Sequence, residues 1–317
     1  METQSRFLQP GDFLELGIFA KTFRRPSVDG VFEAIAQHGL SCTQWNWACV
    51  PGLSSLPHKL TVETRRAVKH AAATSGVRIA AISATFNLID PISRERGLAL
   101  LPVQAEAAIS VDCDLLTLCT GTRNQADMWT HHPDNDTPEA WLEMLDGLRA
   151  ACRIASDYGV RLAIEPETAN VVSDASSAER VLRELGSDSH SVRVILDAAN
   201  LYKPPLDPRT QPEVIDDALA RLGKHISLAH AKDISDLTPG LLGDGCIEHY
   251  THTAAGSGIL PYAHYLNGLL HTPAVLARAQ AGQRLPLILH GLTEEQVTGS
   301  VAFVRKSLEA SSAVRSV

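Results

Sequence analysis

Short apolar runs alternate with longer amphipathic stretches along most of the chain. Each run is nearly continuous in apolar or β-branched residues, which is typical of strands buried on both faces of a parallel sheet. The eight runs are residues 14–20, 42–47, 77–87, 115–121, 161–167, 192–200, 226–233 and 285–292. Their alternation with amphipathic stretches predicts a chain of β/α units.

The stretches between the runs carry helix start and stop signals. Ser27 opens one stretch that ends at Gly39, and Thr61 opens another that stops at Gly76. Ser and Thr cap helix N-termini, whereas glycine favours the left-handed conformation that ends a helix. The predicted helices cover residues 27–38, 61–75, 138–158, 176–185, 211–223 and 294–310.

The number of β/α units and the length of the chain favour a closed barrel. The chain has 317 residues, and a (β/α)8 barrel needs ~250. An open doubly wound sheet would place a glycine-rich phosphate loop after the first strand, and residues 17–26 do not supply one. We therefore predict a single (β/α)8 TIM barrel over residues 1–317. Long loops follow the fourth strand (122–135) and the seventh (234–258), at the end where barrel enzymes build their sites.

Charge, cysteine spacing and hydropathy limit the partners and the cell compartment that we expect. The net charge is −8, and the densest basic stretch is only Arg24-Arg25, so we expect no nucleic-acid partner. The six cysteines show no C-x-x-C or zinc-finger spacing, which fits a reducing compartment. The N-terminus does not resemble a signal peptide, and no apolar run approaches the ~20 residues of a membrane span. We expect a soluble, cytoplasmic protein.

Ionisable side chains interrupt the apolar runs at their carboxyl ends. Glu165, Asp197, His230 and His290 end four consecutive predicted strands. A charge buried there is costly unless it is paired or binds a metal. Adjacent strands lie ~4.8 Å apart, so these side chains can converge on one ion. Individually, a carboxylate there can instead cap a helix or join a salt bridge, and a histidine can be a satisfied polar residue.

The donor types indicate which ion to expect. Carboxylate and imidazole ligands together suit Mn²⁺, Zn²⁺, Co²⁺ or Fe²⁺ better than Ca²⁺. We expect one divalent metal ion as cofactor, with Mn²⁺ ahead of Zn²⁺, Co²⁺ and Fe²⁺.

Four motifs occur in a fixed order. They are GVRLAIEPE (159–167), LDAAN (196–200), HAKD (230–233) and AAGSG (254–258). This set resembles the xylose-isomerase-like barrel superfamily, which contains sugar isomerases and epimerases and, more distantly, endonuclease IV-type DNA repair enzymes. The resemblance covers most of the chain. It implies that Glu165, Asp197 and His230 are metal ligands.

The chain departs from that superfamily at two places. The fourth ligand is usually a glutamate at the end of strand eight, but here the run LILHGL supplies His290. In related ketose epimerases two metal-bound glutamates act as paired acid and base, so this departure weakens a symmetric two-glutamate mechanism. The endonucleases carry extra zinc-binding histidines, where this chain has Asn200, Asn87 and Thr120. DNA repair is therefore disfavoured.

Other polar and aromatic residues are predicted near the barrel mouth. Glu167 shares the parity of Glu165, so it is a candidate second catalytic carboxylate or a residue that orients a ligand. Lys232 shares the parity of His230 and is a candidate for holding a substrate oxyanion. His132 is a candidate proton donor, although the sequence HPDN is also typical of a turn. The candidate substrate-binding residues are Trp45, Asn87, Arg123 and Asn200, with core packing the alternative for Trp45.

Three functional classes remain open. The first is an isomerase or epimerase that acts on a keto-sugar or sugar acid through a metal-stabilised enediolate. The second is a lyase or decarboxylase using the same metal chemistry. The third is a non-catalytic sugar-binding protein. The partner is expected to be a small carbohydrate, non-phosphorylated because no arginine cluster is evident, and the superfamily resemblance allows a homo-oligomer.

Overall fold

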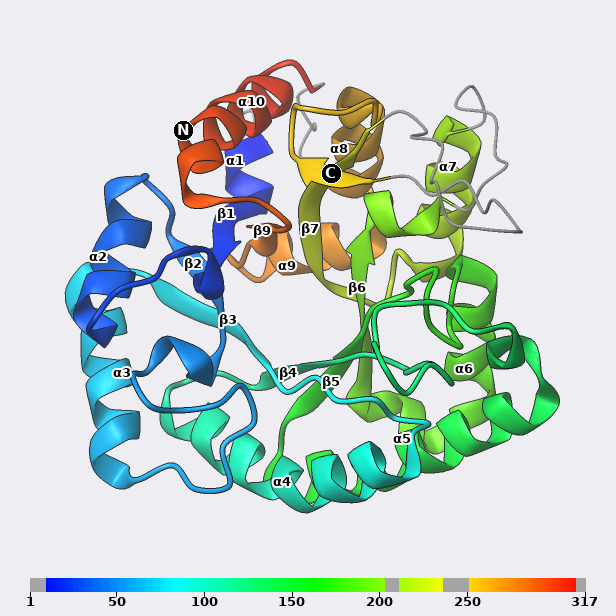
Figure 1. Cartoon of the computed structure of the whole chain (residues 1–317). Coiled ribbons are helices and arrows are strands. Elements are labelled where there is room, and N and C mark those ends of the chain that lie inside the picture. Colours follow the sequence, from blue (N-terminus) through cyan, green and yellow to red (C-terminus); the bar gives the residue numbers. More distant parts are fainter. Residues whose placement is uncertain (1–9, 203–210, 236–250, 312–317) are drawn as a thin grey trace, which may run out of the picture.

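The computed structural model describes residues 10–202, 211–235 and 251–311. Its strands form a ring, and its helices lie outside that ring (Figure 1). The strands are β1 (Leu14–Phe19), β2 (Cys42–Trp45), β3 (Arg78–Ser83), β4 (Leu115–Leu118), β5 (Arg161–Ile164), β6 (Val192–Asp197), β7 (Ile226–Ile234), β8 (His252–Ala254) and β9 (Leu285–Leu289).

The ring is a closed parallel barrel. Strands β1 to β7 pair in sequence order, and β9 closes the ring by pairing with both β7 and β1. Strand β8 stands apart from the ring as an antiparallel partner of the end of β7. The predicted single (β/α)8 TIM barrel is confirmed.

The helices cover the outside of the barrel. They are α1 (Pro10–Phe13), α2 (Val28–Gln37), α3 (Val62–Ser75), α4 (Pro91–Ser110), α5 (Pro138–Tyr158), α6 (Ala175–Leu185), α7 (Gln211–Leu222), α8 (Tyr262–Leu270), α9 (Pro273–Gln280) and α10 (Val297–Glu309). No helix within the described ranges is long and apolar enough to cross a membrane.

The predicted helix boundaries follow from local capping. The Ser27 side chain accepts a hydrogen bond from the backbone N–H of Gly30 at the start of α2. Gly76 and Gly159 end α3 and α5 in the left-handed conformation, with φ of 71° and 68°. Here the sequence signals and the structure agree because each signal satisfies backbone groups at a helix end.

Helices α1, α4, α8 and α9 were not among the predicted helices. Helix α4 contains Gly97 and Pro102, and it begins with Pro91 after an Asp90 cap. A proline inside a helix removes one backbone hydrogen bond, which is why the stretch did not indicate a helix. Its Gly97 lies against the Phe86 ring, where a Cβ atom would lie 2.2 Å from the ring.

The core has two parts. A large cluster fills the layer between the barrel and its helices. A smaller cluster fills the barrel interior, with members on β2 to β7 and β9, including Ala163, Ile195, Leu228 and Ile288. The interior is therefore packed with side chains, and the polar site lies at the carboxyl ends of the strands. The predicted long loop 234–258 contains β8 at its end, and its residues 236–250 lie outside the described part of the chain.

Candidate metal and active site

An acid–imidazole cluster lies at the carboxyl ends of three neighbouring strands. Glu165 follows β5, Asp197 ends β6 and His230 lies in β7. The register of β6 and β7 places Asp197 directly beside His230. Nδ1 of His230 lies 3.1 Å from Oε1 of Glu165 and 3.3 Å from Oδ2 of Asp197. One potential ligand atom from each residue lies within 4.8 Å of the other two.

The cluster is buried on one side and open on the other. Asp197 and His230 are each 1% exposed, whereas Glu165 is partly exposed. A small molecule would therefore reach the cluster from the side of Glu165.

Gln44 holds the far nitrogen of the His230 ring. Oε1 of Gln44 lies 3.0 Å from Nε2 of His230, and the Gln44 amide nitrogen donates to Thr117 Oγ1 at 3.4 Å. Because Gln44 Oε1 is an acceptor, it places a proton on Nε2 and leaves Nδ1 to face the carboxylates. Sequence reasoning missed Gln44, whose one signal was an amide inside a buried apolar run.

Asn200 and Lys232 complete the polar cluster. The Asn200 amide nitrogen donates to Glu165 Oε1 at 2.7 Å, and its carbonyl oxygen accepts from the Lys232 ammonium. The Lys232 Nζ atom also lies 3.3 Å from Oδ2 of Asp197. Lys232 is thus brought to the site as expected, while Asn200 links Lys232 to Glu165.

The mutual contacts shift the pKa values of the cluster. Burial alone would lower the pKa of His230, but Glu165 and Asp197 outweigh it and raise the pKa to about 9. Burial alone would raise the pKa of Asp197, but Lys232 and His230 hold that pKa below its usual range. Lys232 keeps its charge because Asp197 and Glu167 raise its pKa against the effect of burial.

Glu167 is the second carboxylate on the same strand end. Its backbone N–H donates to Val172 O at 3.0 Å, which fixes the turn after β5. Burial raises the pKa of Glu167 to about 7, with a further upward contribution from Glu165 and an opposing one from Lys232. Glu167 therefore lies within the electrostatic reach of the cluster.

His290 lies beside the cluster but does not join its ligand atoms. Its ring stacks on His230 with centroids 4.6 Å apart and an interplanar angle of 16°, and Phe19 stacks with His290 at 4.9 Å. An ion bound to an imidazole nitrogen lies near the plane of that ring, so two stacked parallel rings do not share one ion. Burial and the positive charge of His230 lower the pKa of His290, and its buried Nδ1 has no hydrogen-bond partner within the described residues. This stacked arrangement of the two rings does not place His290 as the predicted fourth metal ligand.

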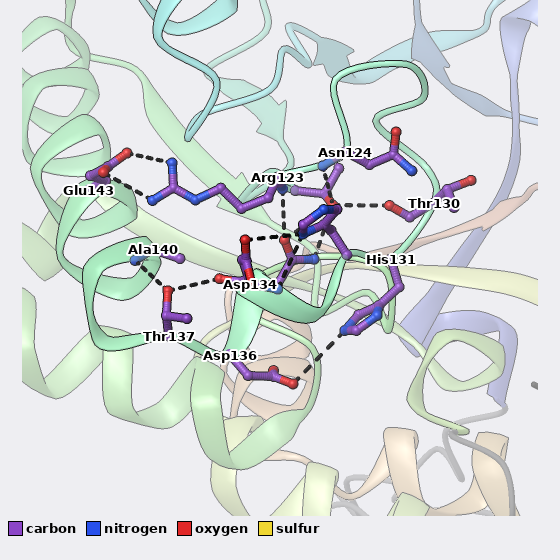
Figure 2. A network of polar contacts seen from close by, with 12 residues as sticks. Arg123, Asn124, Thr130, His131, Asp134, Asp136, Thr137, Ala140 and Glu143 are labelled. Atoms are coloured by element: carbon purple, nitrogen blue, oxygen red, sulfur yellow. Dashed lines mark hydrogen bonds and ion pairs between the residues drawn. The ribbon is translucent and has the colours of Figure 1, made fainter. Parts of the chain in front are cut away.

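Polar side chains of the loop after β4 form hydrogen bonds within the loop and with α5. The Arg123 guanidinium forms two hydrogen bonds with the Glu143 carboxylate, at 2.9 and 3.0 Å (Figure 2). Nδ1 of His132 accepts from the backbone N–H of Asp134 at 3.2 Å, as a helix cap does. Both residues therefore have local partners, and the structure does not bring them into the cluster.

Asn87 and Trp45 also have structural partners. The Asn87 side chain is buried and exchanges hydrogen bonds with the backbone of Thr122, at 2.8 and 3.1 Å. It thereby ties the loop after β3 to the loop after β4. Trp45 is fully buried and stacks on Phe32 of α2 at 4.9 Å. Its indole therefore packs in the helix layer, which agrees with the core-packing alternative and not with a role in substrate binding.

Asp233 organises the segment that follows β8. Its carboxylate accepts backbone N–H groups of Gly256 and Gly258, each at 3.1 Å, and of Leu260 at 2.9 Å. A Cβ atom at Gly258 would lie 2.2 Å from Ile234 O, so glycine is required there. Two N–H groups of the AAGSG motif, those of Gly256 and Gly258, thus bind this carboxylate.

The match to a family model establishes the family. The model described as xylose isomerase-like TIM barrel matches residues 32–274. The chain belongs to this family. A search of the curated proteins finds no match.

Solved structures with the same fold include enzymes of several activities. The apo structure of the 3-keto-D-glucoside 4-epimerase YcjR from E. coli has a TM-score of 0.64 and 18% identity, over 92% of this chain and 99% of the epimerase. The probable 3-DHS dehydratase AsbF from Bacillus anthracis has a TM-score of 0.64 and 13% identity, over 92% and 98%. The IOLI protein with a bound zinc atom has a TM-score of 0.63 and 16% identity, over 93% and 98%. At these identities the likeness shows the fold alone.

The donor set of the cluster fits a divalent metal ion. Two carboxylates and one imidazole present ligand atoms within 4.8 Å of one another. Three protein ligands with one open side are typical of catalytic metal sites, which leave a position for substrate or water. Glu165, Asp197 and His230 are therefore the candidate metal ligands.

Proposed function

We propose that this chain is a divalent-metal-dependent isomerase or epimerase of a keto-sugar or sugar acid, acting through an enediolate. The observation that carries the proposal is the cluster of Glu165, Asp197 and His230 at the open end of the barrel. Mn²⁺ is the proposed ion, with Zn²⁺, Co²⁺ and Fe²⁺ as alternatives. When bound, such an ion supplies polarisation of a carbonyl and an adjacent hydroxyl.

The residues of the chain would move the proton. In the proposed reaction Glu167 removes the proton from the carbon next to the carbonyl, and the C–H electron pair becomes the double bond of the enediolate. Glu167 would exchange the abstracted proton with solvent. Delivery of a proton from Glu167 to the other carbon would give an isomer, and delivery of a solvent-derived proton to the opposite face of the same carbon would give an epimer. Glu165 would hold the metal ion and remains a candidate for the same proton transfer.

Lys232 would stabilise the negative charge that forms on the substrate oxygen. An ammonium group has three N–H donors, and Asp197 and Asn200 account for two of them. No partner for the third donor lies among the described residues, and it would serve a substrate oxygen. No role in this reaction is assigned to four other candidate residues, because their side chains have local partners. They are His132, Arg123, Asn87 and Trp45.

A lyase or decarboxylase is the second candidate. It is favoured by the position of His290, because the end of β9 supplies an imidazole where a symmetric acid–base pair would need a second carboxylate. Cleavage needs one acid or base on one side of the substrate, and Glu165 and Glu167 both come from the end of β5.

Deuterium exchange separates the two candidates. The metal-loaded chain is incubated with keto-sugars and sugar acids in D₂O, and the products are examined by mass spectrometry and NMR. An isomerase or epimerase incorporates solvent deuterium into a product of unchanged carbon skeleton. A lyase or decarboxylase gives a shorter or dehydrated product. If no compound of the panel shows either deuterium exchange or cleavage, both candidate functions are contradicted.

A further inference from the structure

A basic cleft lies at the end of β1, outside the acid–imidazole cluster. Its volume is about 700 Å³, and its walls come from the segments after β1 and β2. Three cationic residues line it, Lys21, Arg24 and Arg25, together with apolar residues such as Phe23. A volume of this size suits a small organic molecule.

The cleft carries uncompensated positive charge. Arg25 forms a two-pronged ion pair with Glu294, one bond of which measures 2.9 Å. Lys21 and Arg24 are exposed, and neither forms an ion pair with any residue in the described ranges. This local excess of positive charge occurs in a chain whose net charge is −8. It marks the cleft as a place for an anion.

The walls of the cleft follow, along the chain, two strands whose side chains lie next to the acid–imidazole cluster. Lys21 lies two residues beyond Phe19, whose ring stacks on His290, which in turn stacks on His230. On the other wall, Cys49 follows β2, the strand that carries Gln44. Both walls thus continue directly from strands whose side chains support His230. The cleft lies on the end of the barrel where its sites form.

We propose that this cleft binds the anionic group, phosphate or carboxylate, of a small organic ligand. Arginine presents a planar fork that matches both groups, and lysine adds a mobile point charge. Under the proposed function, on which this step rests, the ligand is the substrate and the substrate is a sugar phosphate or sugar acid. The sequence alone favoured a non-phosphorylated substrate because no arginine cluster is evident in it. The fold adds Lys21 and places all three cations on the walls of one cleft.

Calorimetry on the metal-free full-length chain tests anion binding without needing metal or turnover. The metal is removed with a chelator, and the chelator is then removed by dialysis. The chain is titrated with inorganic phosphate, with gluconate and with neutral glucose. The test variant is K21E/R24E. The matched control is R66E/K224E, which reverses two exposed cations on α3 and before β7 and changes the net charge equally.

We expect phosphate, gluconate or both to bind the original chain and the control, and glucose not to bind. In K21E/R24E the anion affinity falls by at least about tenfold. Preference for phosphate or for gluconate identifies which anionic group the cleft takes. Absence of binding by both anions, or an equal loss in the two variants, overturns the proposal. Failure of metal binding or of deuterium exchange would leave this result intact, so the two proposals fail separately.

Discussion

Nε2 of His230 lies 3.0 Å from the side-chain oxygen of Gln44, inside the barrel and behind the candidate metal ligands. The contact fixes both the orientation of the ring and the nitrogen that carries its proton. Nδ1 is consequently the nitrogen that faces Glu165 and Asp197. A metal ion bound by this cluster would take Nδ1, with Gln44 as its support from behind.

Replacing Gln44 with leucine should weaken metal binding. Gln44→Leu removes the acceptor of the Nε2 proton, so His230 loses its fixed orientation, and metal affinity should fall by about 10- to 100-fold. Isothermal titration with Mn²⁺ and Zn²⁺ measures the change.

Gln104→Leu is the matched control for this variant. Gln104 is also fully buried and donates to Pro57 O at 3.3 Å, but it lies on α4, away from the cluster. Its variant should keep the original metal affinity. Equal affinities in the two variants would show that Gln44 does not support His230.

Glu165→Gln should abolish turnover and preserve the fold. The amide keeps the shape of the side chain and its hydrogen bond to Asn200, but it carries no negative charge with which to hold the metal ion and cannot take over proton transfer from Glu167. The rate should fall by at least about 100-fold, while the thermal unfolding temperature stays close to that of the original chain. Glu106→Gln, at a largely exposed residue that pairs with Arg65, should retain full activity. Full activity in Glu165→Gln would refute the proposed mechanism.

Metal binding should strengthen as the pH rises. In the metal-free chain the pKa of His230 is raised to about 9, so the ring is protonated at neutral pH. Because a metal ion must displace that proton, affinity should increase by about tenfold per pH unit below pH 9 and level off above it. Titrations in buffers of different ionisation enthalpy would measure the released proton. Affinity that does not change between pH 6 and 8 would contradict this account.

Asp233→Ala should destabilise the chain. The change leaves four backbone N–H groups, those of Ile234, Gly256, Gly258 and Leu260, without this acceptor. Hydrogen bonds to a charged group are strong, but burial of the Asp233 carboxylate offsets part of the gain, so the expected loss in unfolding free energy is about 2 to 4 kcal/mol. Urea denaturation measures this loss. As a control, Asp136→Ala at an exposed residue should change the unfolding free energy by less than about 0.5 kcal/mol. An equally small change in Asp233→Ala would show that Asp233 does not hold the segment after β8.

The barrel was predictable from the sequence because its strands are buried on both faces. Such strands form continuous apolar runs, and capping residues such as Ser27 and Gly159 mark the helices between them. Helix α4 was missed because Gly97 and Pro102 are read as helix breakers until their packing is known.

The site residues could be predicted where an ionisable side chain interrupts an apolar strand. They could not be predicted where the orientation of a side chain depends on contacts with other elements. Glu165, Asp197 and His230 converge because they lie at one level of three neighbouring strands, after β5, at the end of β6 and beside that end in β7. The orientation of the His290 ring and the partner of Arg123 depend on side chains from other elements, which no local pattern specifies. Gln44 was missed for the same reason, since its partner lies on β7.

Elemental analysis of the purified chain tests the central claim most directly. After chelation, the chain is loaded with Mn²⁺, Zn²⁺, Co²⁺ or Fe²⁺ and freed of excess ion. The account predicts about one tightly held divalent ion per chain, its loss in Asp197→Ala, and its retention in the exposed Asp216→Ala. No retained ion under any of these conditions, or equal retention in the two variants, would contradict the proposed metal-dependent chemistry.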